Sequence, residues 1–116
     1  MPHYEPEKYL YDMLSSCEFL LEFTANKTVD DYINERGFRS ALERELQIIG
    51  EALIQLEKVA PTLAGQIPEY QNIIGFRHVL VHGYDSLDPM TVWNVVETKL
   101  EELAQKIQVL LGEYKH

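Results

Sequence analysis

The sequence predicts an all-α domain, an antiparallel bundle of four main helices with one short extra helix. Apolar residues recur every three or four positions over most of the 116 residues, as in helices that each bury one face. Residues typical of helix starts and stops separate these stretches, and strand signals are absent. Because a chain of this length can bury one apolar core but not two, residues 1–116 are predicted to form a single domain.

The first half of the chain predicts two long helices with a short one between them. The first runs from about Glu5 to Ala25. Thr28 then has the features of an N-cap, followed by acidic residues in the first turn of a short helix that ends at Gly37. The second long helix spans about 38–59. The predicted buried residues of the two long helices are Leu10, Met13, Leu14, Cys17, Leu20, Leu21, Leu42, Leu46, Ile49, Leu53 and Leu56.

The second half predicts two more main helices after a connector over residues 61–65. Pro68 is suited to the first position of a helix that runs to His82, and Gly83 is expected to end it in the left-handed conformation. Asp88 and Pro89 are a strong helix start, so the last helix is predicted to run unbroken to about Glu113. Its apolar stripe is Trp93, Val96, Leu100, Leu103, Ile107, Leu110 and Tyr114.

Composition and charge limit the classes of function. The chain is 46% hydrophobic, which argues against disorder, and it carries a net charge of −9. An acidic surface repels phosphate backbones and anionic lipids, so we expect no DNA partner, no membrane and only local contact with RNA. The single Cys17 excludes an intramolecular disulfide and a cysteine-rich zinc site. With no visible secretory signal, we expect a cytoplasmic protein.

Polar and aromatic residues crowd the end of the helix predicted over residues 68–82. They are Arg77, His78, His82 and Tyr84. On an ideal helix, Arg77 and His82 lie about 140° apart and do not share a face. They could converge within one chain if Gly83 lets the last turn unwind, or across a two-fold dimer that brings two such ends to one cleft.

These residues fit metal-free cleavage of a phosphodiester. His82 would exchange a proton with a ribose 2′-hydroxyl or a leaving oxygen, because histidine can do so near neutral pH. Arg77 would hold the scissile phosphate and stabilise the transition state, and Tyr84 would orient the phosphate or stack on a base. Structural roles explain the same residues: His82 as a helix C-terminal cap, Arg77 paired with a carboxylate of another helix, and Tyr84 closing the bundle end.

A metal site is a weaker interpretation of the same segment. His78 and His82 stand at helical positions i and i+4, and such a pair can chelate zinc if a third ligand is present. Asp85 is a candidate for that ligand. The His-Glu-x-x-His pattern of catalytic zinc helices is absent, because Val79 follows His78.

Two features of the long second helix concern packing. Gly50 costs roughly 1 kcal/mol in a helix interior, and we expect it to permit close approach of another helix. Arg39 has Glu43 four residues on, which predicts a pair within the helix. The sequence leaves the roles of Arg44 and Glu51 open.

The segment from Arg77 to Tyr84 resembles the Arg-x4-His-x-Tyr signature of HepT-like proteins, minimal toxin nucleases of the HEPN (higher eukaryote and prokaryote nucleotide-binding) superfamily. Upstream, residues 39–52 resemble the second helix of that family, including its glycine-glutamate step. Residues 74–76 before the arginine and residues 92–93 after the loop also fall where the family has similar residues. The resemblance is specific over residues 39–96 and extends to the whole chain in length and helical pattern.

This resemblance implies a metal-independent ribonuclease without a cofactor, in which Arg77 and His82 are the catalytic pair. His78 stands at the polar position that follows the arginine, as a supporting residue. The family acts as a homodimer whose two chains line one cleft. Tyr84 would be the tyrosine that a nucleotidyltransferase antitoxin modifies with AMP from ATP, which adds bulk and negative charge at the cleft.

The resulting hypothesis is the toxin component of a toxin–antitoxin system, a HepT-like endoribonuclease neutralised by AMPylation of Tyr84. A catalytically inactive helical dimer that binds a nucleotidyltransferase or a nucleotide is the alternative. Loss of RNA cleavage on His82→Ala would separate the two.

Overall fold

A computed structural model describes residues 6–83 and 87–114, and within these residues the chain forms helices and no strand. This confirms the predicted all-α class. The seven helices of the described residues are α1 (Pro6–Phe23), α2 (Val29–Asn34), α3 (Arg36–Val59), α4 (Pro61–Ala64), α5 (Tyr70–His82), α6 (Pro89–Thr98) and α7 (Leu100–Tyr114).

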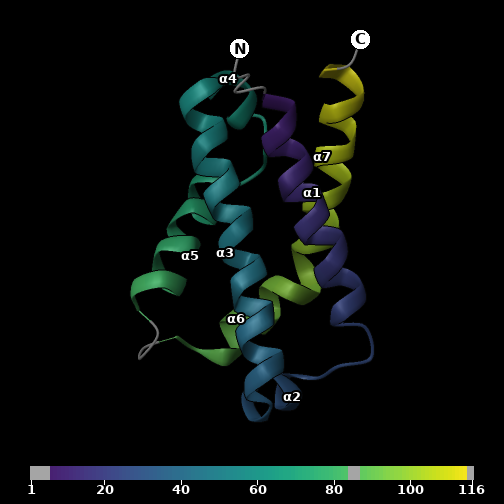
Figure 1. The fold of residues 1–116 in the computed structure, drawn as a ribbon, viewed down its shortest axis with the longest axis vertical. Helices are drawn as coiled ribbons and strands as arrows, with labels where there is room; N and C mark the ends of the chain where they lie inside the picture. Colours follow the sequence, from purple (N-terminus) through teal and green to yellow (C-terminus); the bar gives the residue numbers. More distant parts are fainter. Residues whose placement is uncertain (1–5, 84–86, 115–116) are drawn as a thin grey trace.

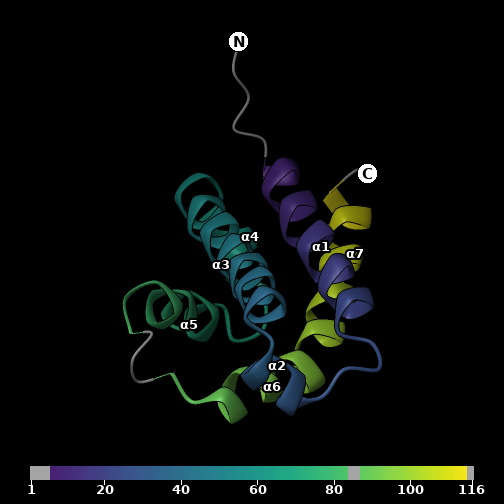
Figure 2. The ribbon, with the colours of Figure 1, turned by 60° about the horizontal axis from the view of Figure 1, so that its bottom comes forward.

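Three long helices form the body of the bundle. α1 packs between α3 and α7, and both of these run antiparallel to it (Figure 1). α5 packs on the outer side of α3, again antiparallel, so it stands at the edge of the bundle. The view in Figure 2 shows α2 and α6 crossing the end of the bundle at which α1 finishes and α3 begins.

The core consists of the predicted stripes. The inner residues of α1 and α3 are buried, with Leu10, Met13, Leu42 and Leu53 fully inaccessible to solvent. Leu14 and Leu21 are only partly buried and pack against the edge of this core. On α6 and α7 the predicted stripe is buried from Trp93 to Leu110; the side chain of Tyr114 lies outside the described residues.

Aromatic rings close the end of the bundle that α2 and α6 cross. Phe38 of α3 has its ring centroid 4.9 Å from that of Phe23 and 6.3 Å from that of Trp93. Tyr32 of α2 lies 6.2 Å from Trp93, measured between ring centroids. These contacts join the consecutive helices α1, α2 and α3 to α6, which is distant in the sequence, and they hold the short α2 in place.

The start of α2 is as predicted, and its end is not. Thr28 caps the helix by accepting the N–H of Asp31, whose carboxylate accepts the N–H of Thr28 in return. The helix ends at Asn34, and Gly37, its predicted end, lies inside α3. Arg39 explains this boundary, since its Nη1 donates to the carbonyl oxygen of Ile33 at 2.7 Å, at the C-terminal end of α2.

The predicted Arg39–Glu43 pair is therefore wrong. Arg39 donates to the carbonyl oxygen of Ile33 at the end of α2, and the Glu43 carboxylate accepts a hydrogen bond from the Tyr32 hydroxyl. Burial and the neighbouring Glu43 carboxylate both raise the pKa of Tyr32 above its usual range. The two side chains of the predicted pair thus each join α3 to α2.

The boundaries of α5 also differ from the prediction. The helix begins at Tyr70, because Glu69 before it adopts a left-handed conformation (φ 58°) that a helix starting at Pro68 could not contain. Gly83 ends the helix with φ −114°, so it is not left-handed. The connector predicted over residues 61–65 contains the single turn of α4, which begins at Pro61.

The predicted last helix is broken at Lys99 into α6 and α7. Asp88 caps α6 as expected, with Pro89 at its first position. Near the break, the Thr98 hydroxyl donates to the carbonyl oxygen of Asn94 at 2.7 Å, a side-chain bond that commonly bends helices. The bend lets α6 pack against α2 while α7 packs along α1.

None of the helices in the described ranges is long and apolar enough to cross a membrane.

Candidate active site on helix α5

The last two turns of α5 carry three of the predicted site residues. Arg77, His78 and His82 all lie on this helix, and Tyr84 lies outside the described residues. The final turn stays helical, since the Gly83 N–H donates to the carbonyl oxygen of Val79 at 2.7 Å. Unwinding at Gly83 therefore does not bring Arg77 and His82 to one face, and within one chain they remain about 140° apart.

Arg77 faces the neighbouring helix α3. A Cβ atom placed on Gly50 would lie 2.6 Å from the Cγ of Arg77, closer than carbon atoms can pack. The glycine therefore allows the stem of Arg77 to lie directly against the backbone of α3. This confirms that Gly50 permits a close approach of two helices, and it identifies α5 as the helix that approaches.

Glu51, the residue after this glycine, holds the guanidinium of Arg77. Nη2 of Arg77 lies 3.0 Å from Oε2 of Glu51, and the arginine side chain is 28% exposed. The Nε atom is buried and has no hydrogen-bond partner among the described residues. Arg77 is thus anchored on α3 by packing and by one ion pair, while its guanidinium keeps hydrogen-bonding capacity that Glu51 does not use.

The two histidines lie on the solvent side of the same helix. His78 and His82 are both exposed, and their ring centroids are 4.7 Å apart with an interplanar angle of 55°. Within residues 6–83 and 87–114, neither ring makes a hydrogen bond, so His82 does not cap the carbonyl groups at the end of α5. The structure brings these rings together and leaves them open to solvent.

A metal site of three or more protein ligands is not found in the described part of the chain. Asp85, the third ligand that the sequence suggested for His78 and His82, lies outside the described residues.

The apolar residues of α5 are incompletely covered within the chain. Among the residues of this helix, Leu80 alone is buried. Val79 is 42% exposed, and Ile73, Ile74, Phe76 and Val81 are only partly buried. Of these side chains, Ile73, Ile74 and Phe76 pack against the core, and Val79 is left exposed.

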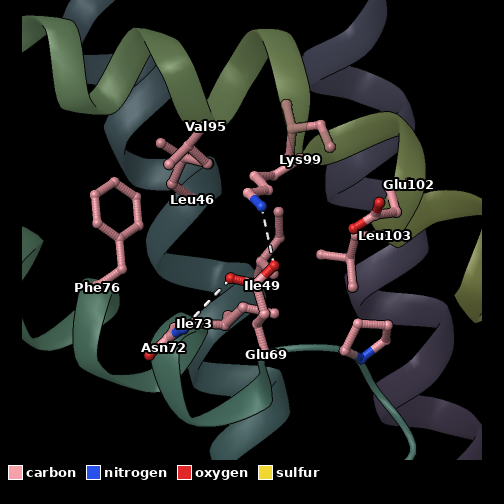
Figure 3. A pocket seen from close by; sticks show the side chains of 12 residues that line it. Leu46, Ile49, Glu69, Asn72, Ile73, Phe76, Val95, Lys99, Glu102 and Leu103 are labelled. Carbon is pink, nitrogen blue, oxygen red and sulfur yellow. Dashed lines mark hydrogen bonds and ion pairs between the residues drawn. The ribbon is translucent and has the colours of Figure 1, made fainter.

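An apolar pocket that no sequence pattern predicted lies beside α5, between α3, α5 and the junction of α6 with α7 (Figure 3). Its volume is about 130 Å³, and Phe76 and Val95 are among its walls, whereas Arg77 and the histidines are not. At its rim the Lys99 ammonium lies 2.9 Å from Oε2 of Glu69 (Figure 3). This contact lowers the pKa of Glu69 and raises that of Lys99.

Comparison with known proteins matches this helical chain to one family. The family described as "Ribonuclease HepT-like" matches residues 13–110, which include α3, the Gly50–Glu51 step and all of α5. The chain belongs to the HepT-like ribonuclease family. This confirms the resemblance that the motif and the second helix suggested.

The HepT-like chain has similar relatives in archaea and bacteria. It is 28% identical over 113 residues to "Putative RNase MJ1216" of Methanocaldococcus jannaschii, covering 97% of this chain and 93% of the relative. It is 29% identical to "Putative RNase TTE0752" of Caldanaerobacter subterraneus, covering 95% and 97%. It is 28% identical to "Probable ribonuclease HepT" of Thermococcus cleftensis, covering 88% and 92%. No solved structure matches it.

Glu51 is the site residue whose role in this HepT-like protein the sequence left open. The sequence feature that points to Glu51 is the glycine before it, because a glycine inside a long helix indicates that another element packs closely there. The sequence could not name that neighbour, since Arg77 follows 26 positions later, beyond the intervening α4.

Proposed function

We propose that this protein is a metal-independent endoribonuclease that needs no cofactor, with Arg77 and His82 as its catalytic residues. The observation that carries the proposal is that α5 holds Arg77 and His82 in two different environments. Arg77 is fixed against α3 by Gly50 and Glu51, while His82 stands free on the solvent side of the same helix. Membership of a ribonuclease family and relatives named as RNases support the substrate class.

The proposed reaction is an attack of the ribose 2′-oxygen on the neighbouring phosphorus. His82 either accepts the proton of the 2′-hydroxyl while water protonates the departing 5′-oxygen, or protonates the 5′-oxygen while water accepts the proton of the 2′-hydroxyl. The bond from phosphorus to the 2′-oxygen forms as the bond to the 5′-oxygen breaks, which leaves a 2′,3′-cyclic phosphate and a 5′-hydroxyl. Arg77 stabilises the charge that grows on the phosphoryl oxygens, and a charge held in place before the reaction does this well.

The complete site is proposed to form between two copies of the chain. Arg77 and His82 lie on different faces of α5, so a two-fold partner is needed to bring one arginine and one histidine to the same phosphate. Val79, an apolar side chain of α5 that is 42% exposed, supplies apolar surface for such a contact. His78 would then support the cleft beside His82.

The proposed toxin role rests on Tyr84. A nucleotidyltransferase antitoxin would transfer AMP from ATP to its hydroxyl: the tyrosine oxygen bonds to the α-phosphorus and pyrophosphate leaves. The added nucleotide carries negative charge and bulk two residues beyond His82, which would repel RNA and cover the cleft. The toxin would act in the cytoplasm, where its RNA substrates and the antitoxin are found.

The test of the nuclease is cleavage of small RNAs by the purified protein with a chelator present. Arg77→Ala and His82→Ala are each expected to lower the rate by about 10²–10⁴-fold with unchanged helicity. Gln71→Ala, an exposed position in the first turn of α5, is the matched control and should keep the rate. Full cleavage by His82→Ala would refute the proposal and favour a catalytically inactive dimer that binds the nucleotidyltransferase or a nucleotide.

The toxin role has a separate test. With the partner nucleotidyltransferase and ATP, the mass of the wild-type chain should rise by that of one AMP group, and RNA cleavage should stop. Tyr84→Phe lacks the acceptor oxygen, so it should gain no mass and stay active. Modification of Tyr84→Phe would show that another residue is the acceptor.

A further inference from the structure

His78 and His82 form a pair that the proposed reaction does not fully use. One turn apart on α5, their ring centroids lie 4.7 Å from each other, and both side chains are exposed. Neither ring is held by a hydrogen bond or an ion pair within the described residues. Two free imidazoles at this separation are a chelating arrangement, since small rotations of the rings can direct one nitrogen of each to a common point.

The chemistry of imidazole determines which ions such a pair would take. Neutral imidazole nitrogens bind Zn²⁺, Ni²⁺ and Cu²⁺ at about 2.0–2.1 Å, whereas Mg²⁺ prefers oxygen ligands. The charge of the chain also favours a cation, because its net charge is −9. The one cation close to the pair in the sequence, Arg77, faces α3 and is paired with Glu51.

The same surroundings determine what kind of site it would be. The described residues hold no group of three or more metal-ligating side chains, so water would complete the coordination of an ion on this pair. Such an open site differs from the closed four-ligand sites that stabilise folds. An ion here would be exchangeable, and it would take the single nitrogen lone pair with which a neutral His82 accepts a proton.

We infer that His78 and His82 form a binding site for a divalent transition-metal ion of the Cu²⁺, Ni²⁺ and Zn²⁺ group, and that the bound ion inhibits the enzyme. The inhibition rests on the proposed function. A nitrogen lone pair that is donated to the metal cannot accept the proton of the 2′-hydroxyl. Metal ions would therefore inhibit this nuclease, although its reaction does not require a metal.

Binding is tested first and without any activity measurement. Titration of the full chain with Ni²⁺, Zn²⁺ or Cu²⁺, followed by calorimetry, should give one ion per chain, with Cu²⁺ tightest. Mg²⁺ should give no binding at the histidines. His78→Gln and His82→Gln should each weaken binding by at least about tenfold, because a single imidazole loses the benefit of a second donor held beside it.

The control addresses the other two histidines, which lie near the ends of the chain. The double variant His3→Gln, His116→Gln keeps the α5 pair and should bind as the wild type does. In NMR spectra, paramagnetic Ni²⁺ should broaden the ring signals of His78 and His82 first. Wild-type affinity in His78→Gln, or binding lost only in the terminal double variant, would overturn the inference.

Inhibition is tested second, on RNA cleavage by the wild-type protein. Zn²⁺ at a saturating concentration should suppress cleavage at least about tenfold, and a chelator should restore it. Binding without inhibition would refute the inhibitory role. If the chain binds the ion but cleaves no RNA under any condition, the proposed nuclease fails while the metal site stands; if it cleaves RNA but binds no ion, the reverse holds.

Discussion

The body of the bundle and its edge helix differ in how many of their apolar residues are fully buried. In α1, α3 and α7 most apolar residues are buried, although Tyr11, Phe19, Val59 and Val109 are exposed. α5 is also rich in apolar residues, yet Leu80 alone of them is buried, and the contact of α5 with α3 includes an arginine packed against a glycine. The body therefore contributes most of the buried core, while α5 carries the side chains that we propose to contact a partner and a substrate.

This difference has a physical origin. A helix that packs on one neighbour buries one stripe, and the rest of its surface remains in water unless another molecule covers it. α5 has such a position at the edge of the bundle (Figure 1). Of this helix, Leu80 belongs to the buried core, and Ile73, Ile74 and Phe76 pack against that core.

The largest expected effect is the difference in alkylation rate between the folded and the unfolded chain at Cys17, which lies in the body of the bundle. Cys17 is fully buried, and this burial raises the pKa of its thiol to about 12 from 9.0. At pH 8 the reactive thiolate is then about a thousandfold scarcer than in the unfolded chain. Alkylation should be correspondingly slow in buffer and fast in guanidinium, as followed by mass spectrometry. Equal rates would mean that α1 opens readily.

Truncation of a core leucine should lower the free energy of unfolding far more than truncation of an exposed side chain on the edge helix. Leu53→Ala removes a side chain with no exposed surface from α3 and should lower the free energy of unfolding by about 2–5 kcal/mol. Val79→Ala on α5 removes a side chain that is 42% exposed, and in dilute solution it should change stability by less than about 0.5 kcal/mol. Urea denaturation measures both. Equal losses would show that the outer face of α5 is covered.

A pair of glycine substitutions tests the contact between body and edge. Gly50→Ala places a methyl group against Arg77, and overpacking of about 1–3 kcal/mol should outweigh the helix-propensity gain of about 1 kcal/mol. Gly75→Ala, on α5 with no atom within 4 Å of the new Cβ, should stabilise the protein by up to about 1 kcal/mol. Thermal unfolding shows whether each substitution lowers or raises Tm. Stabilisation by both would mean that Arg77 does not need the space at Gly50.

The smallest expected effect is the pH dependence of the contact between Glu69 and Lys99. Because the Lys99 ammonium lowers the pKa of Glu69, the ion pair contributes stability above the usual carboxyl range, and the contribution is lost as the pH falls through the lowered value. Between pH 7 and pH 3, Tm should therefore fall slightly further for the wild type than for Glu69→Gln. Glu97→Gln, exposed on α6, should follow the wild type.

Much of the fold follows from local sequence. The spacing of Leu42 to Leu56 defines the buried face of α3, and Thr28 and Asp88 define helix starts, because both features depend on residues within one or two turns. The boundaries that local sequence misplaced were decided by contacts between elements: Arg39 ends α2 from outside it, and packing against two different helices accompanies the bend at Lys99.

The sequence by itself determined that the chain is helical, which faces are apolar, and which segment carries a HepT-like motif, because periodicity and motif are properties of neighbouring residues. The tertiary structure decided that Arg77 lies on Gly50 and pairs with Glu51, that its helix keeps His82 on another face, and that His78 and His82 remain open to solvent. Those facts depend on which helices meet. Burial of the core stripes of α1, α3 and α7 selects the arrangement, and α5 takes the edge position that remains.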